Sequence, residues 1–215
     1  MKISELYEYL DGHRPQLMHV SGKTSVGKTT LANKLVDRYE YCVIELDQIV
    51  LKYVIDKFKL QDSGHAFIEV YKNRQEKEWI KSFIDGAHGE INNALAQAKP
   101  VILDGAIANT DTLSDLLEPY AATLIIYLHP QNIDNYLRNL VNRFSISAPA
   151  DNAGLPSKFW THVDKDDLAQ YYDNRVMTPR LMTAIQEYAE DSKKESKYRL
   201  IAIANQFEDT VVVEI

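Results

Sequence analysis

The sequence predicts an α/β protein with three layers, in which a mostly parallel, five-stranded sheet lies between two layers of helices. Short apolar runs alternate along the chain with segments of helical periodicity, which is typical of such a sheet. A glycine-rich segment, Gly22 to Thr30, separates the first apolar run from the first long helical pattern. The 215 residues are enough for one domain, since a domain holds roughly 150 residues. We therefore expect a single domain over residues 1–215, with a helical insertion.

The expected elements follow the chain in order. A short amphipathic helix at 3–10 precedes the first buried strand, at 16–20. Further strands are expected at 41–46, 100–103, 123–128 and 199–204, with a closing strand at 210–215. Helical patterns follow the glycine-rich segment and occupy 48–98, 131–144 and 166–190. The stretch 145–164 is rich in Ser, Ala, Pro, Asn and Gly, and connections of this length are usually functional or disordered.

Composition excludes several classes of protein. The 24 basic and 31 acidic side chains give a net charge of −7, which argues against a nucleic-acid partner. The single cysteine, Cys42, forms no internal disulfide, and no stretch approaches the ~20 apolar residues of a membrane span. Acidic residues at Glu5 and Glu8 argue against a signal peptide. We expect a cytoplasmic protein that binds no membrane.

A phosphate-binding loop is the most specific motif. Gly22-x-x-x-x-Gly27-Lys28-Thr29 matches the Walker A pattern without a gap or substitution. The glycines permit a sharp turn, and the main-chain N–H groups that follow are expected to form an anion-binding nest at a helix N-terminus. Lys28 would neutralise the β- and γ-phosphates of ATP, and the Thr29 hydroxyl would hold Mg²⁺. The residues expected to bind the nucleotide are Gly22, Lys23, Thr24, Ser25, Val26, Gly27, Lys28, Thr29 and Thr30.

Asp104 directly follows the apolar run at 100–103. A carboxylate at a strand end beside the loop is where a Walker B residue binds Mg²⁺, and the alternative is a turn residue before Gly105. Motor and transporter ATPases commonly carry a Glu at the next position to activate water, whereas this chain has Gly105. The difference favours transfer to a bound acceptor over hydrolysis.

Asp47 closes the second apolar run. Because strand ends line the ligand crevice of an open α/β sheet, its carboxylate is expected to accept the proton of an acceptor hydroxyl. The alternative is a helix N-cap for the segment that starts at Gln48. The base-reading Asn-Lys-x-Asp sequence of GTP-binding switches does not occur, so a GTPase is not expected.

Taken together, these residues resemble the P-loop kinases of small molecules, nearest to the uridine-kinase-like and chloramphenicol-phosphotransferase-like branch. The resemblance covers 16–205 in element order and implies the P-loop NTPase fold. It implies a lid at 144–164 that closes over the phosphates, and an acceptor-binding region at 48–98. It also implies that the backbone at Asn205, after the expected strand at 199–204, contacts adenine.

The resemblance assigns two lid arginines, Arg138 and Arg143, to the transferring phosphoryl group. Five residues apart on a helix, they point about 140° from each other, so both reach the phosphates only if the helix ends early. Alternatively, each is a solvated helix charge. Candidates for the acceptor pocket, for which core packing of the aromatic residues is the alternative, are Tyr53, Arg74, Trp79 and His88, and the lid adds Trp160 and His162.

The resulting hypothesis is an ATP- and Mg²⁺-dependent kinase that transfers the γ-phosphoryl group to a hydroxyl of a small molecule, a nucleoside or another metabolite. The alternatives are a nucleotide-binding regulatory ATPase module and a toxin-like kinase of a sugar nucleotide. The expected partner is the small-molecule acceptor, and the chain is expected to be a monomer or homodimer. In this hypothesis the catalytic residues are Lys28, Asp47, Arg138 and Arg143, and the metal ligands are Thr29 and Asp104.

Overall fold

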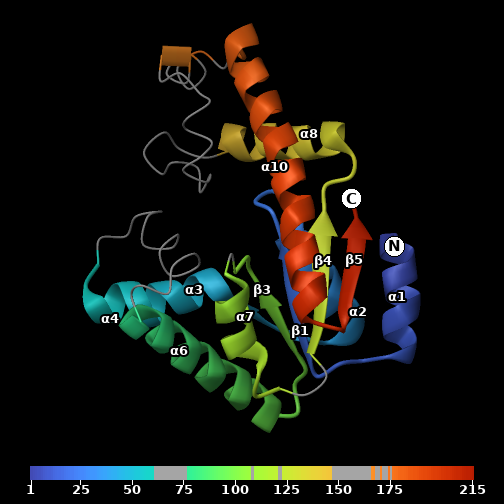
Figure 1. Ribbon diagram of the computed structural model, residues 1–215, viewed down its shortest axis with the longest axis vertical. Helices are drawn as coiled ribbons and strands as arrows, with labels where there is room; N and C mark the ends of the chain where they lie inside the picture. Colours follow the sequence, from blue (N-terminus) through green and yellow to red (C-terminus); the bar gives the residue numbers. More distant parts are fainter. Residues whose placement is uncertain are drawn as a thin grey trace.

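A computed structural model describes residues 1–60, 77–107, 109–120, 123–146, 166–167, 170, 174 and 176–215, without the side chains of 143–146. Five strands form one sheet in the order β2-β3-β1-β4-β5, and every pairing is parallel (Figure 1). This confirms the predicted α/β architecture. The strands are β1 (Leu17–Gly22), β2 (Cys42–Glu45), β3 (Val101–Asp104), β4 (Thr123–His129) and β5 (Thr210–Glu214).

Helices cover both faces of the sheet. The side chains of β1 alternate between two cores: Met18 and Val20 pack with α1, α2 and α8, whereas Leu17 packs with α3, α6 and α7. Because both faces are buried, ligands can reach the strands only at their ends. The helices are α1 (Ile3–Gly12), α2 (Lys28–Tyr39), α3 (Leu46–Val50), the π-helix η1 (Leu51–Ile55), α4 (Asp56–Phe58), α6 (Lys77–Ala96), α7 (Thr110–Leu117), α8 (Ile133–Ile146) and α10 (Pro179–Gln206).

The strand register places the carboxyl ends of β1, β2, β3 and β4 together, and these ends form one edge of the sheet. Gly22 is paired with Leu128, Val20 with Asp104, and Asp104 with Glu45. The segments that follow β1, β2 and β3 therefore begin side by side, and the glycine-rich loop leaves the sheet in the middle of this edge.

Helix α10 includes residues for which the sequence predicted a strand. The expected strand at 199–204 is wrong, because these residues form the last turns of α10. Ile203 is fully buried, while Ile201 is 48% exposed, as one face of a helix requires. A short apolar run cannot by itself distinguish a strand from a buried helix. Asn205 accordingly lies in the last turn of α10 and does not follow a strand; the fifth strand is β5.

The start of α10 also differs from the helix expected at 166–190. The helix begins at Pro179, and the Thr178 hydroxyl accepts a hydrogen bond from the Leu181 N–H at 3.1 Å. Proline suits this first position because its missing N–H would have no partner inside the helix. Although α10 has 28 residues, neither it nor any other helix in the described ranges is long and apolar enough to cross a membrane.

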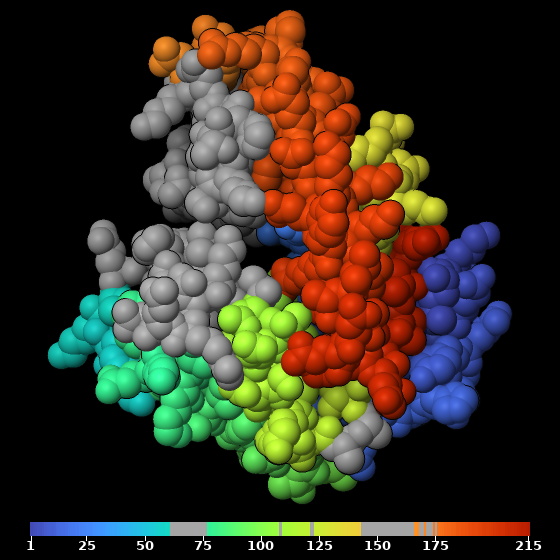
Figure 2. Space-filling view, in the orientation of Figure 1, coloured from blue at the N-terminus to red at the C-terminus, as the bar shows by residue number. Residues whose placement is uncertain are grey.

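Helix α10 contributes to both cores. Leu181 and Ile185 pack in the core shared with α2 and α8, and Ile203 packs in the core shared with α6 and α7. Between these two ends, the helix passes the edge at which the strands end (Figure 1). Figure 2 shows its outer surface as a band, orange to red, between α8 in yellow and α7 in yellow-green.

Tyr53 of η1 packs on Gly86 of α6, and the contact leaves no room for a side chain. A Cβ atom at Gly86 would lie 2.4 Å from Cγ of Tyr53. The ring is held in place because its hydroxyl donates a hydrogen bond to Glu90 Oε1 at 2.9 Å. This contact fixes η1 on α6 within the described part of the expected acceptor region.

We expect Gly86→Ala to lower the free energy of unfolding by about 1–3 kcal/mol, because overpacking forces the Tyr53 ring out of place. Urea denaturation followed by circular dichroism measures the change. Gly89→Ala on the same helix is the matched control, since a Cβ there meets nothing within 4 Å. That control should gain about 1 kcal/mol from helix propensity. Equal stabilities of the two variants would contradict the packing interpretation.

Candidate functional site

The glycine-rich loop joins β1 to α2, and its glycines occupy positions that need them. Gly22 has φ +143°, and a Cβ there would lie 2.7 Å from the carbonyl oxygen of Leu128 on β4. Gly27 has φ +101° and is the N-cap of α2. Ser25 also has a positive φ of 62°, a left-handed conformation that is uncommon for a residue with a side chain. The loop is therefore a tightly turned segment with a strained backbone.

The loop ends at the positive end of the α2 dipole, which together with the main-chain N–H groups of the first helical turn forms a site for anions. Lys28 is the first residue of α2, and its Nζ donates a hydrogen bond to the carbonyl oxygen of Lys23 at 3.0 Å. The Val26 N–H donates to the same oxygen at 3.3 Å. The Lys28 ammonium thus lies across the loop, where a phosphate group held by the loop would meet it.

Thr29 and Asp104 bring two oxygen ligands together beside the loop. The Thr29 hydroxyl donates a hydrogen bond to Asp104 Oδ2 at 2.7 Å. Asp104 is only 6% exposed, and its Oδ1 is buried without a hydrogen-bond partner among the residues described. A buried carboxylate oxygen with an unused lone pair beside a hydroxyl fits Mg²⁺, which takes few protein ligands and keeps its waters. The pair predicted from sequence is therefore chemically suited to the metal.

Asp47 lies at the same edge, two residues beyond the strand that was expected to carry it. Strand β2 ends at Glu45, which is the N-cap of α3, so Asp47 lies in the first turn of α3. The N-cap interpretation of Asp47 is therefore wrong. Its side chain is exposed, and the neighbouring strand end carries Asp104. The exposed carboxylate is accessible to a small molecule bound at this edge.

The described structure shows no contact between Arg138 and the loop. Arg138 is exposed on α8, and Arg143 lies on the same helix with its side chain outside the description. Of the expected lid at 144–164, residues 147–164 lie outside the described residues. The two arginines remain a prediction.

Three acceptor candidates have structural contacts. Tyr53 packs on Gly86, and Trp79 packs against Phe58 with ring centroids 6.4 Å apart. His88 Nε2 lies 2.9 Å from the carbonyl oxygen of Leu116. Of the acceptor region, 61–76 lies outside the description, and so do Arg74, Trp160 and His162.

His19 is a buried residue of the site that sequence reasoning missed. It is fully buried on β1, and its Nε2–H donates a hydrogen bond to the Gly105 carbonyl at 2.9 Å, which ties β1 to the segment after Asp104. Burial, together with the positive charges of Arg199 and Lys28, lowers the pKa of His19 to about 4, against the opposing effect of the hydrogen bond to Gly105. His19 is therefore neutral at pH 7. The only signal in the sequence was one polar residue inside an apolar run.

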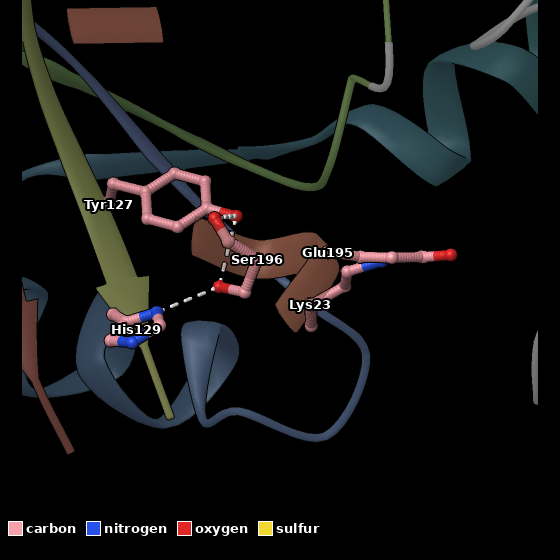
Figure 3. Close-up of polar contacts among 5 residues, drawn as sticks. All are labelled: Lys23, Tyr127, His129, Glu195 and Ser196. Atoms are coloured by element: carbon pink, nitrogen blue, oxygen red, sulfur yellow. Dashed lines mark hydrogen bonds and ion pairs between the residues drawn. The ribbon is translucent and has the colours of Figure 1, made fainter. Parts of the chain in front are cut away.

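Helix α10 also contacts the site through residues that the sequence did not indicate. Lys23 Nζ lies 2.5 Å from Glu195 Oε2, and the next residue, Ser196, contacts Tyr127 and His129 at the end of β4 (Figure 3). Lys23 and Glu195 are 172 positions apart, and no local pattern reports a contact at that separation. Arg199, expected in a strand, lies on the same helix, and burial lowers its pKa.

Comparison with known proteins gives one family match. Residues 17–131 match a family model described as an AAA domain, which is more than half of the chain. The matched segment contains the glycine-rich loop, Asp47, Asp104 and strands β1 to β4, and it supports the resemblance drawn from the motif. None of the curated proteins compared with the chain matches it.

Several solved structures are similar to the chain at low identity. A gluconokinase from Sinorhizobium meliloti 1021 is 16% identical, with 85% of this chain and 98% of that chain covered and a TM-score of 0.40. A shikimate kinase from Bacteroides thetaiotaomicron is 15% identical, with 81% and 96% covered and a TM-score of 0.37. An uncharacterized protein from Eubacterium ventriosum ATCC 27560 is 15% identical, with 93% and 88% covered and a TM-score of 0.40. Likeness at this level carries no information on a substrate.

His19 gives the stability of the fold a defined pH dependence. Its pKa is about 4 in the folded chain against an ordinary 6.5, so between these values the unfolded chain binds more protons. The contribution of neutral His19 is complete above pH 6.5 and is lost as the pH falls toward 4. From pH 7 to pH 5, we expect this to cost about 2 kcal/mol of unfolding free energy.

Urea denaturation at pH 7 and pH 5 tests this expectation. His19→Gln keeps an N–H for Gly105 and should lose the extra destabilisation at pH 5. His13→Gln, at an exposed histidine, should keep the behaviour of the wild type. The same loss of stability in the wild type and His19→Gln would show that His19 is not the titrating group.

Proposed function

The chain belongs to the AAA domain family, and from that premise we propose that it is an ATP- and Mg²⁺-dependent kinase that phosphorylates a hydroxyl of a small molecule. The observation that carries the proposal is the hydrogen bond from Thr29 to the buried Asp104, directly beside Lys28 and the loop. Phosphoryl transfer needs little covalent help from the protein, and catalysis is mostly positioning and charge neutralisation. The groups at this edge supply both.

The phosphates of ATP would bind to the loop N–H groups at the start of α2. On binding, Lys28 would exchange the carbonyl oxygen of Lys23 for oxygens of the β- and γ-phosphates. This exchange replaces a neutral acceptor with charged ones, so the hydrogen bond becomes stronger. We therefore expect Lys28 to favour the oxygens of a bound triphosphate over its hydrogen bond to the Lys23 carbonyl oxygen.

Thr29 and Asp104 are the residues that would hold Mg²⁺. When bound, the ion offsets negative charge on the β- and γ-phosphates.

One of the two arginines of α8, Arg138 or Arg143, is proposed to neutralise charge on the transferring phosphoryl group.

Asp47 is proposed as the group that receives the acceptor proton. The acceptor oxygen would form a bond to the γ-phosphorus while the bond from that phosphorus to the leaving oxygen of ADP breaks. The hydroxyl proton passes to the Asp47 carboxylate, which is exposed at the edge where the acceptor binds. The residue after Asp104 is Gly105, so no carboxylate there activates water, which favours an organic acceptor.

The single, partly buried Cys42 supports a cytoplasmic location for this reaction.

We expect Asp47→Asn to reduce acceptor-dependent release of ADP by about 10²-fold, because the acceptor loses its base. The dissociation constant for ATP should stay within about twofold, since Asp47 contacts no phosphate in this mechanism. A coupled ADP assay with panels of nucleosides, sugars, vitamins and antibiotics measures turnover. Asp37→Asn, an exposed carboxylate on α2, is the matched control and should behave as the wild type.

Each other outcome of this assay has a defined meaning. Normal turnover in Asp47→Asn removes Asp47 from the mechanism. Steady release of phosphate without any acceptor contradicts the kinase and favours the regulatory ATPase module. In a separate expression experiment, growth arrest that Asp47→Asn abolishes favours the toxin-like kinase of a sugar nucleotide.

A further inference from the structure

Two adjacent residues of α10 join this helix to the phosphate loop and to β4. Glu195 Oε2 lies 2.5 Å from Lys23 Nζ, and the Tyr127 hydroxyl donates to the carbonyl oxygen of Ser196 at 3.2 Å. The Ser196 hydroxyl oxygen lies 3.1 Å from His129 Nδ1 (Figure 3). Because Ser196 is fully buried and bound to the end of β4, the backbone that carries Glu195 is fixed relative to the sheet.

The ion pair of Lys23 and Glu195 differs from an ordinary surface pair. The side chain of Lys23 is only 20% exposed and that of Glu195 is 41% exposed, so solvent screens the pair less than it screens two exposed groups. The pair also joins segments that are 172 positions apart. It therefore connects the first residues of the loop to a helix anchored in the core.

Lys23 also contributes to the shape of the loop through its main chain. Its carbonyl oxygen accepts hydrogen bonds from Lys28 Nζ and from the Val26 N–H. The same short loop holds Ser25 at φ +62°, a conformation that persists in a non-glycine residue only when surrounding contacts enforce it. A fixed Lys23 side chain restrains the peptide that carries this carbonyl, and with it the loop.

We propose that Glu195 is a positioning residue for nucleotide binding, which acts through Lys23 to hold the phosphate loop in the shape that receives a triphosphate. This proposal rests on the proposed function.

The ion pair of Lys23 and Glu195 has a second property: each charge neutralises the other. Removing Lys23 alone makes the charge beside the loop more negative, which disfavours a triphosphate, so the effect of removing the Glu195 carboxylate depends on whether Lys23 is present.

Equilibrium titration with an unhydrolysable ATP analogue and Mg²⁺ tests the proposal on the full chain. We expect Glu195→Gln to raise the dissociation constant about threefold to tenfold. The value of kcat should change less than about twofold, since the loop is formed once nucleotide is bound. Glu190→Gln, an exposed glutamate on the same helix with the same change of charge, should bind as the wild type.

A double-mutant cycle with Lys23→Met separates positioning from a general loss of stability. Lys23→Met alone should weaken binding, because it removes the anchor and one positive charge beside the loop. Adding Glu195→Gln to Lys23→Met should then strengthen binding, because it restores the charge balance beside the loop. This reversal of sign is not produced by a contact that only stabilises the fold.

Hydrogen exchange gives a readout that needs no nucleotide. The amides of residues 22–30 should exchange faster in Glu195→Gln than in the wild type, while those of β4 stay unchanged. Equal or tighter nucleotide binding by Glu195→Gln, or unchanged exchange of the loop, overturns the proposal. A wild type that binds nucleotide without phosphoryl transfer overturns only the kinase function, and the titrations still decide the role of Glu195. A wild type that binds no nucleotide overturns both.

Discussion

The close approach of Gly22 to the carbonyl oxygen of Leu128 is the constraint on which the rest of the site depends. With any other residue at position 22, a Cβ atom would lie 2.7 Å from that oxygen. Glycine lets the central strand end against β4 and turn at once into the loop. The turn places Lys28 and Thr29 in the first turn of α2, and Asp104 ends the adjacent strand β3. A different turn would move the hydroxyl of Thr29 away from its carboxylate partner.

Buried polar contacts hold the strand ends around this loop. His19 donates to the Gly105 carbonyl on one side of β1, and Ser196 contacts Tyr127 and His129 on the side of β4. The His19 contact pairs a main-chain carbonyl and the Ser196 contacts pair side chains, so these polar groups have partners inside the protein. The loop therefore lies on a rigid base, as a site that positions phosphates requires. The helix that completes this base, α10, comes from the far end of the chain.

Much of this arrangement could be predicted from the sequence, for physical reasons that are specific to each element. Strands at 16–20, 41–46, 100–103 and 123–128 were found within two residues of β1 to β4, because a buried parallel strand is a continuous apolar run closed by turn residues. The run at 199–204 is also mostly apolar, but it belongs to α10. The residues that pack around it in the core decide its conformation. Asp47 does not directly follow its strand but lies two residues after the end of β2, because α3 begins directly after Glu45 and the sequence does not show this start. The contact between Lys23 and Glu195 could not be predicted, because it depends on how α10 crosses the strand ends.

The most direct measurement is a calorimetric titration of the full chain with an unhydrolysable ATP analogue in the presence of Mg²⁺, repeated with Lys28→Met. We expect binding at one site in the wild type and binding about 10²-fold weaker in the variant, since a charge-assisted contact to the phosphates is lost. No heat of binding in the wild type, or equal affinity in Lys28→Met, would contradict a phosphate site at this loop.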